Sequence, residues 1–148
     1  MREGKNNMDT IKIFDVTKEE QEYICSCLVR FNNSKVPFTQ KPLTIYVNKC
    51  IKDGDEVIGG ILSEVYCWNI LSIDVLWVKD EHRNKGYAKV LVDSVENEAR
   101  KMGCRISHLD TFDFQAKEVY EKFGYAVFGV LEDCPEGHNR YYMSKKLL

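Results

Sequence analysis

Hydrophobic positions change their spacing several times along the chain, and each change predicts a different element. Runs rich in β-branched and aromatic residues cover 43–51, 57–68 and 71–78, which predicts three strands. Asp53–Gly54 separates the first two runs and predicts a hairpin turn. The pattern therefore predicts three successive antiparallel strands, the last of which ends at Val78.

The N-terminal part begins with a weak alternation at 11–16, which predicts a short strand. Thr17 and Glu20 follow with the spacing of a capping box, in which each side chain accepts a hydrogen bond from the other residue's backbone N–H. A helix is predicted to follow, with an apolar face that contains Tyr23, Ile24, Cys27, Leu28 and Phe31. The polar, proline-containing stretch 31–42 is predicted to be a loop.

Helical spacing returns twice in the second half of the chain. One helix is predicted from Ala88 to Gly103, with an apolar stripe made of Leu91, Val92, Val95, Ala99 and Met102. The segment 106–109 after it is a short buried strand, so that strand, helix and strand form a parallel βαβ unit. A second helix is predicted at 115–123, before strands at 125–131 and 140–146. The predicted fold class is α/β, with a mixed, mostly antiparallel sheet of about seven strands and three to four helices.

Composition narrows the possible function classes. The 148 residues have the length of one domain, so 1–148 is predicted to be a single domain. A net charge of −2 and the lack of a cationic run argue against a nucleic-acid partner. No window approaches the ~18 apolar residues of a membrane span, and residues 1–10 lack the apolar core of a signal peptide. We therefore expect a cytoplasmic protein with no membrane partner.

The six cysteines include no Cys-x-x-Cys pair, and most of them fall within apolar patterns. They are Cys25, Cys27, Cys50, Cys67, Cys104 and Cys134. We expect reduced thiols, with no metal site, and regard a disulfide or zinc site as the minor alternative because cytosolic chains rarely keep disulfides.

The loop after Val78 carries the first candidate chemistry, the motif Arg83-x-x-Gly86-x-Ala88. Small residues let a ligand approach the backbone closely, and the first N–H groups of a helix have no partner within the helix. Those groups and the cations Arg83 and Lys85 suit a pyrophosphate. The alternative is an ordinary βα turn with solvated charges, since one glycine motif is weak evidence by itself.

A second motif, Ala116-x-x-x-Tyr120-x-x-x-Gly124-Tyr125, follows about thirty residues after the first. Together the two motifs resemble the paired coenzyme A and catalytic motifs of the GNAT N-acetyltransferase superfamily. The resemblance implies acetyl-CoA as cosubstrate, bound where the strand before the loop splays from the next parallel strand and leaves a V-shaped cleft. It assigns cofactor binding to the backbone of Leu76, Trp77 and Val78, and to Arg83, Asn84, Lys85, Gly86, Tyr87, Ala88 and Gln115.

By the same resemblance, Tyr120 matches the tyrosine that can protonate the leaving thiolate. An ordinary tyrosine has a pKa near ~10, above that of a thiol near ~8.5, so its hydroxyl would act as a hydrogen-bond donor or acid. The alternative is that Tyr120 only packs beside Val119 and Phe123 in the helix stripe. Spacing alone favours packing, and the motif favours catalysis.

The general base is less clearly marked in the sequence. Asp74 and Glu64 are the carboxylates that could face the cleft, directly or through one water molecule, although either could instead pair with a surface lysine. Ser72 stands where histone-type members of the superfamily carry a glutamate, which argues against their base mechanism. His108 is expected to be a hydrogen-bonded residue of the sheet.

The resemblance leaves two functional classes. The first is an enzyme that transfers acetyl from acetyl-CoA to a primary amine of a small molecule or peptide by direct attack on the thioester. The second is a catalytically inactive CoA-binding module that serves sensing or interaction. A polyamine, an antibiotic amine and a peptide N-terminus all remain open as acceptors. A homodimer is also predicted, with the turn at 135–137 at the acceptor mouth or in the dimer contact.

Overall fold

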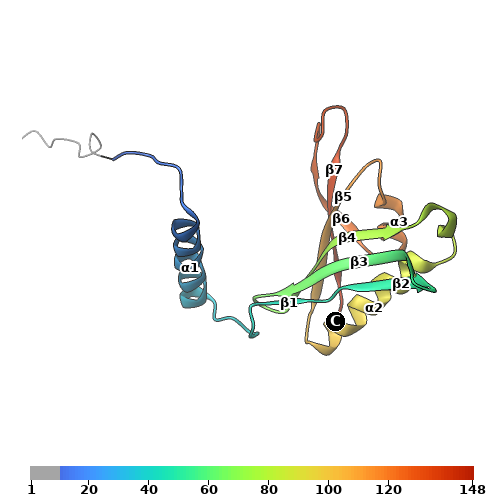
Figure 1. Cartoon of the computed structure of the whole chain (residues 1–148), viewed down its shortest axis with the longest axis horizontal. Coiled ribbons are helices and arrows are strands. Elements are labelled where there is room, and N and C mark those ends of the chain that lie inside the picture. Colours follow the sequence, from blue (N-terminus) through green and yellow to red (C-terminus); the bar gives the residue numbers. More distant parts are fainter. Residues whose placement is uncertain (1–10) are drawn as a thin grey trace, which may run out of the picture. The chain divides into compact units, whose positions relative to one another are not determined.

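The computed structural model describes residues 11–148 (Figure 1). The chain divides into two compact units, Met1–Pro37 and Phe38–Leu148. Within the described part of the chain, no helix is long and apolar enough to cross a membrane.

The first unit contains helix α1, Lys18–Lys35. Its predicted capping box is present: Thr17 N donates to Glu20 Oε2 at 2.8 Å, and Glu20 N donates to Thr17 Oγ1 at 3.2 Å. The strand predicted at 11–16 is wrong, because this segment has no strand partner among the described residues. Alternation is only a local signal, whereas a strand needs a neighbour to satisfy its backbone groups.

The second unit is built on one seven-stranded sheet, in which neighbours follow the order β1-β3-β4-β5-β7-β6 and β2 also pairs with β3. The strands are β1 Thr44–Tyr46, β2 Lys49–Asp53, β3 Glu56–Tyr66, β4 Ile70–Val78, β5 Ile106–Phe112, β6 Ala126–Leu131 and β7 Arg140–Lys146. Among the strand pairs of residues 11–148, only β4–β5 is parallel. The mixed, mostly antiparallel α/β class predicted from the sequence is confirmed.

Two helices and one 3-10 turn connect these strands. The 3-10 turn η2, Asp80–His82, and helix α2, Tyr87–Lys101, lie between β4 and β5, and helix α3, Lys117–Lys122, lies between β5 and β6. Helix α2 runs along the sheet in Figure 1 and contacts β2, β3 and β4. Four residues of its predicted stripe are buried, with Leu91, Val92, Val95 and Ala99 each at most 2% exposed, whereas the fifth, Met102, is partly buried just after the helix ends.

At two of the predicted boundaries that the structure corrects, a side chain takes the place of a backbone partner. The strand predicted at 43–51 is interrupted after Tyr46, where Asn48 Oδ1 accepts a hydrogen bond from Ser63 N at 2.9 Å. The helix predicted at 115–123 begins at Lys117, because Gln115 Oε1 accepts from the backbone N–H of Phe112 at 3.0 Å and closes a turn.

Gly59 allows the sheet and α2 to approach closely. A Cβ on Gly59 would lie 3.3 Å from the carbonyl oxygen of Trp77 and 3.6 Å from Leu91 Cδ1. A side chain there would crowd both the β4 backbone and α2, so glycine suits this position, beside the part of β4 that was predicted to bind the cofactor.

Candidate active site

Strands β4 and β5 share only a short stretch of pairing. The register joins Leu71 with Ser107, Ser72 with His108 and Ile73 with Leu109, and then stops. β4 continues to Val78 and β5 to Phe112, so each strand runs on without the other. The predicted splay is present, and it leaves the β5-facing edge of Leu76, Trp77 and Val78 without a strand partner in the described residues.

Asp74 lies at the point where the two strands separate. The β3–β4 register passes from Leu62 opposite Val75 to Ser63 opposite Ile73, so Asp74 is the extra residue of a β-bulge. Bulges commonly redirect a side chain beside an active site. The carboxylate accepts a hydrogen bond from Ser72 Oγ at 2.9 Å.

Glu64, the other carboxylate predicted as a base, is on β3 directly opposite Ser72. Ser72 is thus a neighbour of both acids, one by hydrogen bond and one by strand register. Glu64 is half-buried, and Asp74 is exposed. The structure therefore brings both candidates to one region of the sheet, on the face opposite α2.

The loop between β4 and α2 has two residues with left-handed backbone conformation. Asn84 has φ +60° and Gly86 has φ +84°, both in the left-handed region, and a Cβ on Gly86 would meet nothing within 4 Å. Helix α2 begins directly after Gly86 with no side-chain cap and no acidic residue in its first turn. The first N–H groups of α2 are therefore available to an anion.

Arg83 braces this loop. Its Nε donates to the carbonyl oxygen of Val78 at 3.0 Å, and its Nη2 lies 2.8 Å from Asp80 Oδ1. A guanidinium has five N–H donors, so these two contacts leave three for another acceptor. Lys85 makes no ion pair among the described residues.

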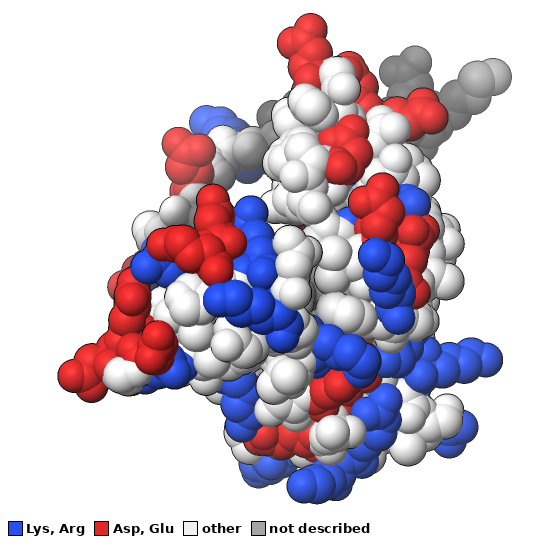
Figure 2. Space-filling model, turned by 90° about the vertical axis from the view of Figure 1, so that its right-hand side faces the viewer, with Lys and Arg blue, Asp and Glu red and all other residues white. Residues whose placement is uncertain are grey.

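On the face drawn in Figure 2, acidic and basic side chains are interspersed, and neither sign covers it.

Tyr120 on α3 is 6% exposed and belongs to the core cluster. Burial, which disfavours the phenolate, and to a lesser extent the charge of Asp110, raise the pKa of Tyr120 to about 12. The raised pKa keeps the hydroxyl protonated. The hydroxyl has no hydrogen-bond partner among the described residues, and every fully buried side-chain oxygen in that part of the chain has one. The Tyr120 oxygen is therefore not fully buried.

Comparison with known proteins shows to which family this strand, loop and helix arrangement belongs. Residues 9–125 match the profile described as Acetyltransferase (GNAT) family. The chain belongs to the GNAT family. The match covers both motifs, from the loop before α2 to Tyr125, and the chain is accordingly an acetyltransferase.

Individual relatives agree with this family assignment. A Blasticidin-S acetyltransferase from Streptomyces morookaense is 32% identical over 108 residues, which are 72% of this chain and 79% of that protein. The crystal structure of an acetyltransferase from Bacillus cereus ATCC 14579 covers 94% of this chain and 99% of its own, with 34% identity and a TM-score of 0.84. An aminoglycoside 6′-N-acetyltransferase complexed with coenzyme A has the same fold, with a TM-score of 0.62 and 18% identity over 93% of this chain and 98% of that one.

Other predicted residues of this GNAT chain have local partners. Gln115 accepts hydrogen bonds from Phe112 N and Thr111 Oγ1, which holds the turn between β5 and α3, and its contact with cofactor stays a prediction. Tyr87 packs against His82 with ring centroids 6.3 Å apart. The residues around Pro135 form the connection between β6 and β7 as predicted, and homodimerisation stays a prediction.

His108 is hydrogen-bonded, as the sequence predicts. Its Nε2 lies 2.7 Å from Tyr66 Oη, and the two rings meet edge to face with centroids 5.8 Å apart. Burial, followed by the charges of Cys67 and Glu64, raises the pKa of Tyr66. Sequence reasoning did not find Tyr66, because only the strand order brings it beside His108.

Sequence reasoning also missed Glu96, which is 1% exposed on α2. A signal was present, since Glu96 is four residues after Val92 and three before Ala99, and therefore falls on the apolar stripe. A charged residue on a buried face needs partners, and the structure supplies them from other elements.

Proposed function

We propose that this acetyltransferase transfers the acetyl group of acetyl-CoA to a primary amine of a small molecule or a peptide, by direct attack of the amine on the thioester. The observation that carries the proposal is the short β4–β5 pairing, which stops after Ile73 and Leu109. The free edge of β4, the uncapped start of α2 and the protonated Tyr120 hydroxyl are complementary to the parts of such a thioester cosubstrate.

The residues present fit this cosubstrate in two respects. Leu76–Val78 offer backbone donors and acceptors to an extended amide-containing arm, as in the addition of a strand to a sheet edge. The N–H groups after Gly86 and the remaining donors of Arg83 suit a pyrophosphate, with Asn84, Lys85, Tyr87 and Ala88 completing the loop. Bound there, acetyl-CoA would supply an activated acetyl group.

The chain itself then has to stabilise charge and move protons. A backbone N–H of the free edge of β4 would stabilise negative charge on the carbonyl oxygen. Tyr120 would donate a proton to the departing sulfur, because its raised pKa keeps the proton available. Asp74, at the bulge, would accept the proton of the attacking amine directly or through one water, with Glu64 as the second candidate.

The acceptor is proposed to be a cationic amine. Asp74 and Glu64 belong to the face of the sheet opposite α2, and Asp110 of β5 is on the same face, paired with Arg140 at 2.7 Å. Carboxylates attract ammonium groups before one of them is deprotonated for attack. The name of the Streptomyces relative, Blasticidin-S acetyltransferase, supports a small-molecule amine.

A panel assay tests the proposal. The purified chain is mixed with acetyl-CoA and polyamines, aminoglycosides, blasticidin S or peptides with a free N-terminus, and thiol release is followed together with the mass of the product. The expected result is stoichiometric acetylation of at least one class of amine. Calorimetric binding of coenzyme A without transfer to any amine would instead indicate the inactive CoA-binding module, and no binding would overturn the proposal.

A further inference from the structure

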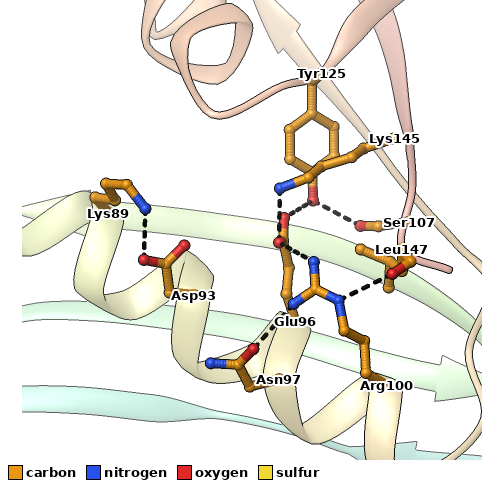
Figure 3. A network of polar contacts seen from close by, with 9 residues as sticks. All are labelled: Lys89, Asp93, Glu96, Asn97, Arg100, Ser107, Tyr125, Lys145 and Leu147. Carbon is orange, nitrogen blue, oxygen red and sulfur yellow. Dashed lines mark hydrogen bonds and ion pairs between the residues drawn. The ribbon is translucent and has the colours of Figure 1, made fainter.

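A polar cluster around the buried Glu96 carboxylate joins α2 to the far half of the sheet. Glu96 Oε1 accepts from Tyr125 Oη at 3.0 Å, and Oε2 accepts from Lys145 Nζ at 2.7 Å and from Arg100 Nη2 at 3.2 Å (Figure 3). Tyr125 Oη is also 2.8 Å from Ser107 Oγ. We name these five residues the Glu96 cluster. A carboxylate can only accept, so Tyr125 donates to Glu96 and Ser107 donates to Tyr125.

Stability alone does not account for this arrangement. Burying a carboxylate costs free energy, and apolar residues of similar volume commonly stabilise a fold as well as a buried ion pair does. What such a cluster adds is a defined geometry, because the Glu96 carboxylate and the Tyr125 hydroxyl are each held from more than one direction. The Glu96 cluster therefore defines the relative positions of α2, β5, β7 and the start of β6.

The backbone at Gly124 is shaped for the same cluster. Gly124 has φ +93°, and a Cβ there would lie 3.4 Å from Lys145 Cε. A glycine thus lets the lysine side chain pass over the chain and reach Glu96. The Lys145 ammonium also lies 5.6 Å from the centre of the Tyr125 ring.

Tyr125 connects the cluster to the proposed catalytic acid. Tyr125 N donates to the carbonyl oxygen of Tyr120 at 3.0 Å, and the two rings meet edge to face, 5.8 Å apart at 69°. The Tyr125 ring is held at its hydroxyl by Glu96 and Ser107 and at its backbone by α3. The fixed Tyr125 ring therefore restricts the rotation of the neighbouring Tyr120 ring.

We propose that the Glu96 cluster holds the Tyr120 ring in one orientation beside the opening between β4 and β5, and that Glu96 and Tyr125 are positioning residues for acetyl transfer. The inference rests on the proposed function of Tyr120. β4 and β5 share only three paired positions, so the cluster supplies a second connection between the α2 side and β5. An acid that is misplaced by about 1 Å can lose 100-fold in rate.

The test uses the full chain labelled with ¹³C at the ring ζ carbon of tyrosine, in which the Tyr120 resonance is assigned by its loss in Tyr120→Phe. Tyr125→Phe keeps the packed ring and removes the hydroxyl, and Glu96→Gln removes the charge with little change of shape. Asp93→Asn is the matched control on the same helix, because it breaks the exposed Lys89–Asp93 pair and leaves the cluster intact (Figure 3).

We expect both cluster variants, but not the control, to shift or broaden the Tyr120 resonance. Turnover should fall about tenfold with the KM for acetyl-CoA changed less than about twofold, and the same variants should cause no further loss in a Tyr120→Phe background. An unmoved resonance, unchanged turnover, or an undiminished loss in that background would each overturn the proposal. If the wild type acetylates no amine, the proposed function fails and the resonance alone decides whether the cluster holds Tyr120.

Discussion

The two sides of β4 are bonded very differently. Toward β3, eight of its residues have a register partner, from Ile70 opposite Tyr66 to Val78 opposite Gly59. Toward β5, the pairing involves only Leu71, Ser72 and Ile73. One strand therefore has a nearly closed edge and a nearly open one.

This difference shows how the fold separates support from function. The antiparallel β3–β4 pair joins strands that are adjacent in the chain, and Gly59 brings it close to α2. The parallel β4–β5 pair needs a helical crossover, and its end is left open beside Asp74. The closed edge holds the strand still, and the open edge keeps backbone groups free for a ligand.

The largest expected effect is on turnover at the open edge. Tyr120→Phe keeps the packed ring and removes the hydroxyl, so kcat should fall about 100-fold to 10,000-fold while the KM for acetyl-CoA stays nearly unchanged. Tyr141→Phe is the control, since its ring packs near Lys117 and its hydroxyl has no proposed role. Equal kcat in wild type and Tyr120→Phe, measured with a good acceptor, would return Tyr120 to a packing role.

The next effect concerns cosubstrate affinity at the end of the open edge. Arg83→Met should weaken coenzyme A binding about tenfold, because hydrogen bonds to charged groups are among the stronger ones. Lys79→Met removes the same charge nearby, from a lysine paired with Glu56 at 2.6 Å, and should change affinity much less. Calorimetry at two salt concentrations checks both. Equal losses in the two variants would mean that only net charge matters.

A smaller effect is expected from disturbing the closed edge. Gly59→Ala places a methyl group against the Trp77 carbonyl and should lower the free energy of unfolding by about 1 to 2 kcal/mol relative to Gly129→Ala. Gly129 is the control because its Cβ would meet only Tyr142 side-chain atoms at 3.8 Å and 3.9 Å. Urea unfolding measures the difference. Identical midpoints would show that β3 and β4 are packed less tightly than described.

The smallest effect is a dependence of stability on alkaline pH. The pKa of Tyr120 is raised from 10.0 to about 12, so above about pH 10 the unfolded chain loses this proton first. Stability should fall as pH rises from about 10 to 12, and Tyr120→Phe should lose a few degrees less in Tm over this range. Tyr125, whose pKa burial also raises, is common to both proteins. Parallel changes of Tm with pH in the two proteins would contradict the raised pKa of Tyr120.

Much of this fold follows from local patterns in the sequence. The α2 stripe, the loop with Gly86 and the motif around Tyr120 depend on residues close together in the chain, and the structure places them as predicted. The strand expected at 11–16 is absent because alternation does not supply a partner strand. The late start of α3 depends on one side chain, that of Gln115.

The features that define the site depend on distant partners. The bulge at Asp74 appears only when β3 and β4 are paired, and the end of the β4–β5 pairing only when α2 has crossed the sheet. Glu96 could be noticed as a charge on an apolar stripe, but Lys145, its partner 49 residues away, could not be foreseen. Local sequence patterns thus identify the segments expected to bind a ligand, and pairing between distant segments determines how those segments are arranged in space.

Hydrogen–deuterium exchange with and without coenzyme A tests the central claim, that the open edge of β4 binds the cosubstrate. Peptides that cover Asp74–Val78 and Asn84–Ala88 should exchange more slowly when coenzyme A is bound, because ligand groups then pair with their backbone N–H groups. Peptides of β6 and the outer part of β7 should be unchanged. Tight binding of coenzyme A with no protection of either β4 or the loop before α2 would contradict the account.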